Sequence, residues 1–328
     1  MKAWAGHDVW SVFLYIRLRG WRNAGKCGML WTAAERRKDV TAMTIVKHYR
    51  ENKALRDSFN RLAKATFGLD FEPWYQHGFW TDSYDPYSVV IDGKVIANVS
   101  VNRTDMIIGG GRRKLYQLGT VMTDPVHRGK GYVRAIMAEI EKDIADADGV
   151  YLFANDNVCE FYPKFGFVQG IEHIYARAVL QSGECRMRKI AMDGPEGWNR
   201  LRAAMEKSAF ETACTMVDNP GLIFFYAAQF LKDCVYHDAQ TDAWVIAEIE
   251  DGELMIHNIF APENVELGNV IAAFGGGIRR VTLGFAPKDA AGFACEPYHE
   301  EDCTFFVRGV AFDDFAQRKL RIPSLSHA

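Results

Sequence analysis

A basic turn that contains glycine is the first stretch of this sequence whose residues could do chemistry. The run Leu118–Met122 predicts a buried strand, Asp124-Pro125 ends it, and Arg128-Gly129-Lys130-Gly131 follows. Apolar residues then recur at steps of three and four, which predicts one amphipathic helix that begins inside the turn: Val133, Ile136, Met137, Ile140 and Ile144. Such a helix start leaves backbone N–H groups unpaired at the positive end of the helix dipole. Glycines let a ligand approach the backbone closely, so the turn predicts a site for a phosphate or a similar anion.

A second stretch, further along the chain, offers a proton donor. Val150–Ala154 predicts a short buried strand, and Asn155-Asp156-Asn157 supplies capping residues for another helix. Tyr162 follows Asn155 by seven residues and precedes Gly166-Phe167. A phenol has a usual pKa of about 10, so it is protonated at neutral pH. The alternatives are a core tyrosine at a helix end and an Asn155 that only caps that helix.

The basic turn satisfies neither the dinucleotide fingerprint nor the Walker phosphate loop. It resembles the acyl-CoA loop of the GNAT N-acetyltransferases, Arg/Gln-x-x-Gly-x-Gly/Ala, written here as Arg128–Val133 with Val133 in the final small position. The second stretch resembles another GNAT signature, Asn-x-x-Ala-x-x-x-Tyr-x-x-x-Gly-Phe, with Val158 in the alanine place. The resemblance covers residues 44 to about 180. It implies an α/β fold with a mixed sheet in the order β-α-α-β-β-β-α-β-α-β-β.

The resemblance implies roles for individual residues in the direct transfer of an acetyl group from acetyl-CoA to a primary amine. Tyr162 would be the general acid, and Asn155 would hydrogen-bond the CoA arm. The backbone of three strand residues would hold the pantetheine: Val121, Met122 and Thr123. The turn would hold the pyrophosphate through Arg128, Gly129, Lys130, Gly131, Tyr132, Val133 and Arg134.

The general base and the acceptor amine are less defined. Many relatives carry a glutamate on the strand before the CoA loop, whereas this strand has no carboxylate, which leaves several candidates: Asp124, Asp82, His77, Glu160 and His173. Trp74, Trp80 and Asp82 belong to an aromatic segment with carboxylates, a composition that suits an amine cation. Simple packing of these rings over the sheet is the alternative. The acceptor is a small-molecule or protein amine.

The composition of the chain limits which partners we expect the protein to bind. The formal charge is −3, but residues 1–42 carry eight Lys and Arg against three Asp and Glu, a net of +5, which leaves −8 for the remainder. Such an acidic body argues against nucleic acid and favours cationic partners. The seven cysteines show no metal-binding spacing, so we expect no metal, reduced thiols and a cytoplasmic protein. The apolar run Val9–Ile16 is too short to span a bilayer, so we expect no membrane partner.

At 328 residues the chain predicts more than one domain. We expect residues 1–42 to lie outside the fold, residues 43–180 to form the acetyltransferase domain, and residues 190–328 to form a degenerate GNAT-like half, as in bacterial two-unit members of the family. This second half lacks the Arg-x-x-Gly-x-Gly turn, so we expect it not to hold CoA. The competing interpretation is a catalytically silent module that binds acyl-CoA or senses a ligand. A homodimer is an open alternative for the oligomeric state.

Overall fold

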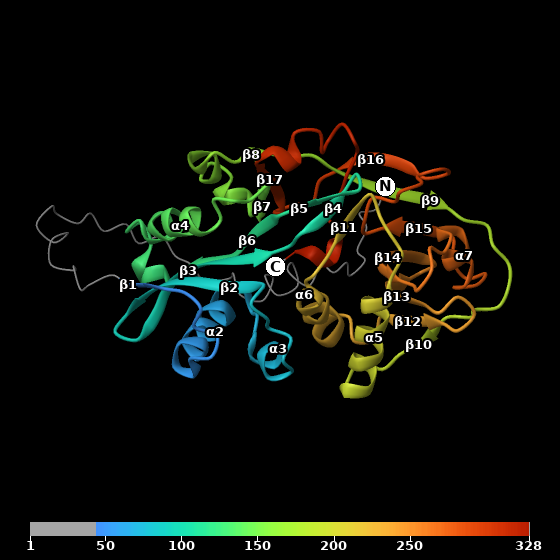
Figure 1. Cartoon of the computed structure of the whole chain (residues 1–328), viewed down its shortest axis with the longest axis horizontal. Coiled ribbons are helices and arrows are strands. Elements are labelled where there is room, and N and C mark those ends of the chain that lie inside the picture. Colours follow the sequence, from blue (N-terminus) through green and yellow to red (C-terminus); the bar gives the residue numbers. More distant parts are fainter. Residues whose placement is uncertain (1–43, 328) are drawn as a thin grey trace, which may run out of the picture. The chain divides into compact units, whose positions relative to one another are not determined.

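The computed structural model describes residues 44–327 (Figure 1), so the extension expected at residues 1–42 lies outside the described residues. The described chain forms two compact units. The first comprises the chain up to Gly78 together with Tyr84–Asn102 and Leu118–Ala145, and the second comprises Phe79–Ser83, Arg103–Gln117 and the chain from Asp146 onwards.

The first unit is a sheet covered by helices on both faces. Its strands follow the order β1-β2-β3-β6, with the bounds Thr44–Val46, Tyr84–Ile91, Lys94–Arg103 and Leu115–Thr123. Its helices are α2 (Lys53–Phe67), α3 (Glu72–Gln76) and α4 (Tyr132–Asp143). Figure 1 shows α2 and α3 on one side of β2 and β3, and α4 on the other. The faces are fixed by contacts such as the Tyr87 hydroxyl to Asp143 of α4 (2.9 Å) and the Val95 amide to Ser58 of α2 (2.9 Å).

The ends of these elements follow the local sequence signals. The Asn52 side chain accepts a hydrogen bond from the Leu55 amide (3.2 Å) and so caps α2, and Gly68 ends the helix in the left-handed conformation. Asp92 and Gly93 form the two-residue turn between β2 and β3 with positive φ angles of 49° and 71°. The helix and the hairpin therefore end where their local sequences favour an end.

The second unit begins where β6 pairs with β7 (Gly149–Ala154). This parallel ladder joins three residue pairs, from Leu115 with Gly149 to Gln117 with Tyr151. On its other edge β7 pairs antiparallel with β17 (Thr304–Arg308), which in turn pairs with β8 (Val168–Gln169). A strand from near the end of the chain therefore lies between two strands of its middle.

A second sheet occupies the rest of this unit. Its strand order is β10-β12-β13-β14-β15-β9-β16, with the bounds Arg188–Lys189, Val235–Asp238, Ala243–Glu250, Glu253–Phe260, Arg280–Leu283, Glu172–Ala178 and Ala294–Tyr298. β14 and β15 run parallel, and the other neighbours run antiparallel. The helices of this unit are α5 (Pro195–Lys207), α6 (Pro220–Phe225), which continues as a π-helical turn over Tyr226–Phe230, and α7 (Leu267–Ala272). A small three-stranded sheet has the order β11-β4-β5, with the bounds Cys214–Met216, Met106–Ile108 and Gly111–Arg113.

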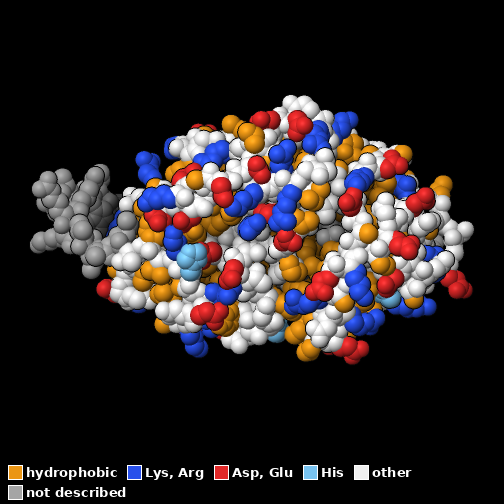
Figure 2. Space-filling model, viewed as in Figure 1, with side chains coloured by type: hydrophobic (Ala, Val, Ile, Leu, Met, Phe, Trp, Pro, Cys, Tyr) orange, Lys and Arg blue, Asp and Glu red, His pale blue; other side chains and the backbone are white. Residues whose placement is uncertain are grey.

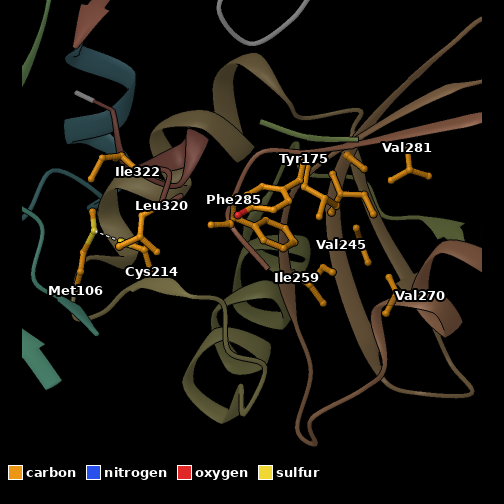
Figure 3. Close-up of a cluster of buried hydrophobic side chains, with 14 of the residues drawn as sticks. Met106, Tyr175, Cys214, Val245, Ile259, Val270, Val281, Phe285, Leu320 and Ile322 are labelled. Atoms are coloured by element: carbon orange, nitrogen blue, oxygen red, sulfur yellow. Dashed lines mark hydrogen bonds between the residues drawn. The ribbon is translucent and has the colours of Figure 1, made fainter. Parts of the chain in front are cut away.

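A hydrophobic core holds this unit together (Figure 3). Alternate residues of the second sheet, such as Val245 and Val281, are buried in it with Phe285. Cys214 and Met106 extend the core to the small sheet, with 3.1 Å between the thiol and the thioether sulfur. Burial raises the pKa of the Cys214 thiol far above its usual value, so this cysteine is an inert apolar side chain.

Charge is mixed on the surface. On the face that Figure 2 shows, basic side chains are interspersed with acidic ones. Many of the charges are paired locally, as Lys53 is with Asp57 across one turn of α2 (2.8 Å) and Arg112 is with the buried Asp105 (2.7 Å). Acidic and basic side chains are therefore mixed on this surface and do not form separate acidic and basic patches.

Two expectations differ from the structure. The compact units do not follow the two consecutive domains expected at 43–180 and 190–328, because β9 joins the second sheet while β17 joins β7. The α-helix expected after Asn155 is wrong, since that segment forms two 3₁₀ turns, Asp156–Val158 and Tyr162–Phe165. Pro163 has no N–H to continue a helix, and Gly166 closes the second turn with φ 79°.

Candidate active site

Strand β6 contains a residue in the left-handed conformation, Thr120. This residue has φ +48°, and it is the one β-branched residue among the non-glycine residues with positive φ in the described chain. The other seven are His48, Asp92, Asp218, Asp242, Asp251, Asp302 and Lys319. A β-branched side chain in the left-handed region costs on the order of 1–3 kcal/mol, so the surroundings must impose it. Thr120 follows the end of the β6–β7 ladder at Gln117 and precedes Val121, Met122 and Thr123, the predicted pantetheine-binding residues.

A short capped turn carries the chain from β6 to the glycine loop. The Asp124 amide donates to the Ile96 carbonyl of β3 (2.8 Å), which ties the end of β6 to the sheet. The Asp124 carboxylate accepts from the Val126 amide (3.0 Å) and thereby caps the 3₁₀ turn Pro125–His127. Arg128 Nε donates to the Thr123 carbonyl (3.4 Å), and its side chain is exposed. Asp124, a candidate general base, therefore has a capping role in this structure.

The glycine loop has the geometry of an anion site. Gly129 and Gly131 have φ angles of 74° and 83°, and a methyl group on either would meet no atom within 4 Å. Within the described chain, five amides at the start of α4 have no hydrogen-bond acceptor: those of Gly129, Gly131, Tyr132, Val133 and Arg134. These N–H groups lie at the positive end of a twelve-residue helix, beside open space. The predicted turn and its helix are confirmed, with the helix start at Tyr132.

Three buried residues anchor the loop through α4. Ile136, Met137 and Ile140 have almost no exposed surface, so the apolar stripe read from the sequence faces the sheet. Val133, which occupies the place of a small residue in the resemblance, is half-buried. The helix is thereby fixed while its first turn remains accessible.

Tyr162 lies in the second unit inside an aromatic cluster. Its ring contacts Phe161, Phe306 and Phe167 at centroid distances of 5.4, 5.8 and 6.3 Å, and the residue is 5% exposed. Burial raises the pKa of the phenol to about 12, with a small contribution from Cys159. Within residues 44–327 the hydroxyl is not among the fully enclosed polar side-chain atoms that lack a hydrogen-bond partner. The group is therefore a phenol that carries its proton at neutral pH.

Asn155 also lies in the second unit. Its position in the sequence suggested a helix cap, but its side chain has another hydrogen-bond partner. Its side chain makes no capping bond, and Nδ2 donates to the Asp302 carbonyl (3.1 Å). Asp156 and Asp302 exchange hydrogen bonds through their amides and carboxylates (2.8 and 3.2 Å). These bonds fix the turn before Tyr162, and the predicted contact of Asn155 with the CoA arm stays a prediction.

The predicted acceptor residues are divided between the two units. Trp74, in the first unit, is buried against Phe71 and Tyr84, as the packing alternative expected. Trp80 and Asp82 belong to the second unit, where Trp80 is buried and Asp82 is exposed. Their role in binding an amine stays a prediction.

The other candidate bases have different surroundings. His77 and Glu160 are exposed, and His173 is buried, which lowers its pKa. Glu172, beside His173, was not singled out from the sequence. Burial raises the pKa of this carboxyl to about 7. The available signal was a carboxylate at the first position of a strand that continues with the apolar residues Ile174, Tyr175 and Ala176.

No helix within residues 44–327 combines the length and the apolar character needed to cross a membrane. The same residues contain no cluster of three His, Cys, Asp or Glu side chains placed to bind a metal ion.

Comparison with known proteins agrees with this architecture. Residues 48–170 match the acetyltransferase (GNAT) domain family, and no curated protein sequence matches the chain. A probable N-acyltransferase of unknown function from Enterococcus faecalis is similar in structure over 84% of this chain and 74% of its own, with a TM-score of 0.55 and 19% identity. A GCN5-related N-acetyltransferase from Kribbella flavida matches over 82% and 72%, with a TM-score of 0.50 and 18% identity. Eis1 from Mycobacterium abscessus matches over 82% and 74%, with a TM-score of 0.51 and 16% identity.

The mixed α/β fold is therefore that of the GCN5-related N-acetyltransferases, and the likeness to solved structures extends well beyond the matched domain. The match of residues 48–170 to the GNAT acetyltransferase domain family agrees with this fold.

Proposed function

We propose that the protein transfers an acetyl group from acetyl-CoA to a primary amine. The observation that carries the proposal is the set of unpaired amides at the start of α4, which follow two glycines in the left-handed region. Such amides suit the pyrophosphate of a coenzyme, and the exposed Arg128 and Lys130 side chains add positive charge beside it. The backbone of Val121, Met122 and Thr123 is the continuation of this site toward the thioester.

The chemistry requires one proton donor and one free amine. The amine nitrogen attacks the thioester carbonyl carbon, a C–N bond forms, and the C–S bond breaks with its electron pair leaving on sulfur. Tyr162 gives its hydroxyl proton to the thiolate and regains a proton from water, while the amine loses its proton to water. A phenol with a pKa of about 12 is fully protonated at neutral pH and so is ready to donate.

The proposed acceptor is a small cationic amine that uses Trp74, Trp80 and Asp82. Aromatic rings and a carboxylate are the groups that bind ammonium ions. The proposed location is the cytoplasm, in keeping with six free cysteines in the described chain.

The test is thiol release from acetyl-CoA across a panel of amines. Tyr162→Phe should lower kcat by about a hundredfold or more, because it removes the general acid. Its dissociation constant for CoA should stay within about twofold, because the ring remains. Tyr175→Phe is the matched control: it is equally buried in the same unit, and its hydroxyl is already bonded to the Lys319 carbonyl (2.9 Å).

Two outcomes would contradict the proposal. Tight CoA binding with no turnover of any amine would favour the silent binding or sensing module. Full activity of Tyr162→Phe would assign the proton donor elsewhere.

A further inference from the structure

The left-handed conformation of Thr120 is held by two buried side chains from neighbouring strands. Asn98, on β3, is fully buried, and its Nδ2 donates to the Thr120 carbonyl (2.9 Å). The Tyr84 hydroxyl, on β2, shares a hydrogen bond with Thr120 Oγ1 (2.6 Å). Both the backbone and the side chain of the strained residue are therefore fixed.

The Asn98 amide is itself oriented by further bonds. Its Oδ1 accepts from Ser88 Oγ (2.8 Å), and its Nδ2 also donates to Ser100 Oγ (2.9 Å). Ser88 Oγ in turn bonds the Tyr49 hydroxyl (2.7 Å). Such a chain of bonds leaves the side chain of Asn98 one orientation.

These bonds act on the part of β6 that matters for the proposed reaction. β3 and β6 are neighbours in the sheet, and two further hydrogen bonds join them here, from Asn98 to the Thr120 carbonyl and from the Asp124 amide to the Ile96 carbonyl. Residues Val121–Thr123 lie between these two hydrogen bonds, and the glycine loop follows them directly. A backbone outlier persists only where its surroundings impose it, and such outliers concentrate at binding and catalytic sites.

We propose that Asn98 and Tyr84 are positioning residues for the coenzyme. By holding Thr120 in its left-handed conformation, they set the backbone groups of Val121–Thr123 and the start of the glycine loop in the conformation that binds CoA. The inference rests on the proposed function. Neither residue is a catalytic residue, because each acts through Thr120.

The test is CoA affinity measured by calorimetry, with circular dichroism to establish that each variant is folded. Asn98→Ala should raise the dissociation constant for CoA by about tenfold, since it removes the hydrogen bond to the Thr120 carbonyl. Ser58→Ala is the matched control, because it removes a buried hydrogen bond of the same length, from the Val95 amide (2.9 Å), that does not involve Asn98, Tyr84 or Thr120. It should lower the melting temperature and leave the affinity within about twofold.

A second pair of variants separates positioning from general stability. Glycine adopts a φ of +48° without strain. In a Thr120→Gly background, Asn98→Ala should therefore raise the dissociation constant for CoA by less than about threefold. Tyr84→Phe keeps the buried ring and removes the hydroxyl, so it should weaken CoA binding by about threefold or more.

The outcomes distinguish this inference from the proposed function. If the wild-type protein binds no CoA, the proposed function fails and this inference fails with it. If the wild type binds CoA while Asn98→Ala and Tyr84→Phe bind it equally well, only the positioning role is overturned. Should Asn98→Ala not fold, the affinity of Tyr84→Phe decides, and a value within twofold of the wild type rejects the proposal.

Discussion

Glu172 lies in the interior of the second unit, on β9, and is only 4% exposed. One carboxylate oxygen accepts from the Ile322 amide (2.8 Å). Arg321, which is 1% exposed, has one guanidinium nitrogen, Nη2, without a partner in the described chain. Burial raises the pKa of the Glu172 carboxyl to about 7, and the charge of Arg321 offsets part of this effect. The carboxyl therefore changes charge near neutral pH.

This shift makes stability depend on pH. The folded pKa of Glu172 is about 7 and the ordinary value is 4.5, so between these pH values the folded state holds the proton more tightly. The stabilisation is complete below pH 4.5 and is lost as the pH rises to about 7, by on the order of 3 kcal/mol. Glu172→Gln should thus be more stable than the wild type at pH 8 and similar to it at pH 5, in urea unfolding at both values.

The exposed Glu184 provides the control for this comparison. Glu184→Gln should change the free energy of unfolding little at either pH. A Glu172→Gln difference that is the same at pH 5 and pH 8 would show that the carboxyl has no shifted pKa.

At the scale of elements, the glycine loop and its helix could be predicted from sequence because their determinants are local. The spacing of Ile136, Met137 and Ile140 fixes the helix face, and the glycines fix its start. The strain at Thr120 could not be predicted, since its partners come from β2 and β3 and depend on strand register. Asn155 could not be predicted for the same reason. Its sequence context favours a helix cap, but its side-chain amide donates to the carbonyl of Asp302, far along the chain.

The loop allows a prediction with a matched control. Gly131→Ala should weaken CoA binding by about tenfold or more, because a methyl group would occupy the open space beside the unpaired amides. Gly110→Ala introduces the same backbone strain, at φ 79° in the turn between β4 and β5, where a methyl group also meets no atom. Each variant should lose about 1–2 kcal/mol of stability.

Calorimetric titration with CoA and thermal unfolding of both variants would test this. If the two substitutions weaken CoA binding equally, the loop is not the phosphate site.

At the scale of the whole molecule, segments far apart in the sequence pair in one sheet and share one core. β17 supplies five residue pairs to β7, and the chain after it buries Leu320 and Ile322 in the core of the second unit. Sequence periodicity can indicate that such an apolar segment is a strand. It could not identify the pairing of β17, because any apolar strand has the same pattern whichever neighbour it meets.

The fragment 43–180, expected from sequence to be a domain, should therefore not fold alone. Without β17, β7 would have an unpaired, apolar edge, and β9 would lack both its neighbours, β15 and β16. We expect the isolated fragment to be insoluble or to lack a cooperative thermal transition by circular dichroism, whereas residues 43–328 should show one. A cooperative transition of the short fragment would contradict this expectation.

The position of β17 also governs the order of events during synthesis on the ribosome. Thr304 pairs with Ala154, about 150 residues earlier. One edge of β7 therefore stays unpaired until nearly the whole polypeptide has been translated. Long separations between paired strands slow folding and expose strand edges to aggregation meanwhile. Yields in cells should accordingly respond to chaperone supply and growth temperature, even when the finished protein is stable.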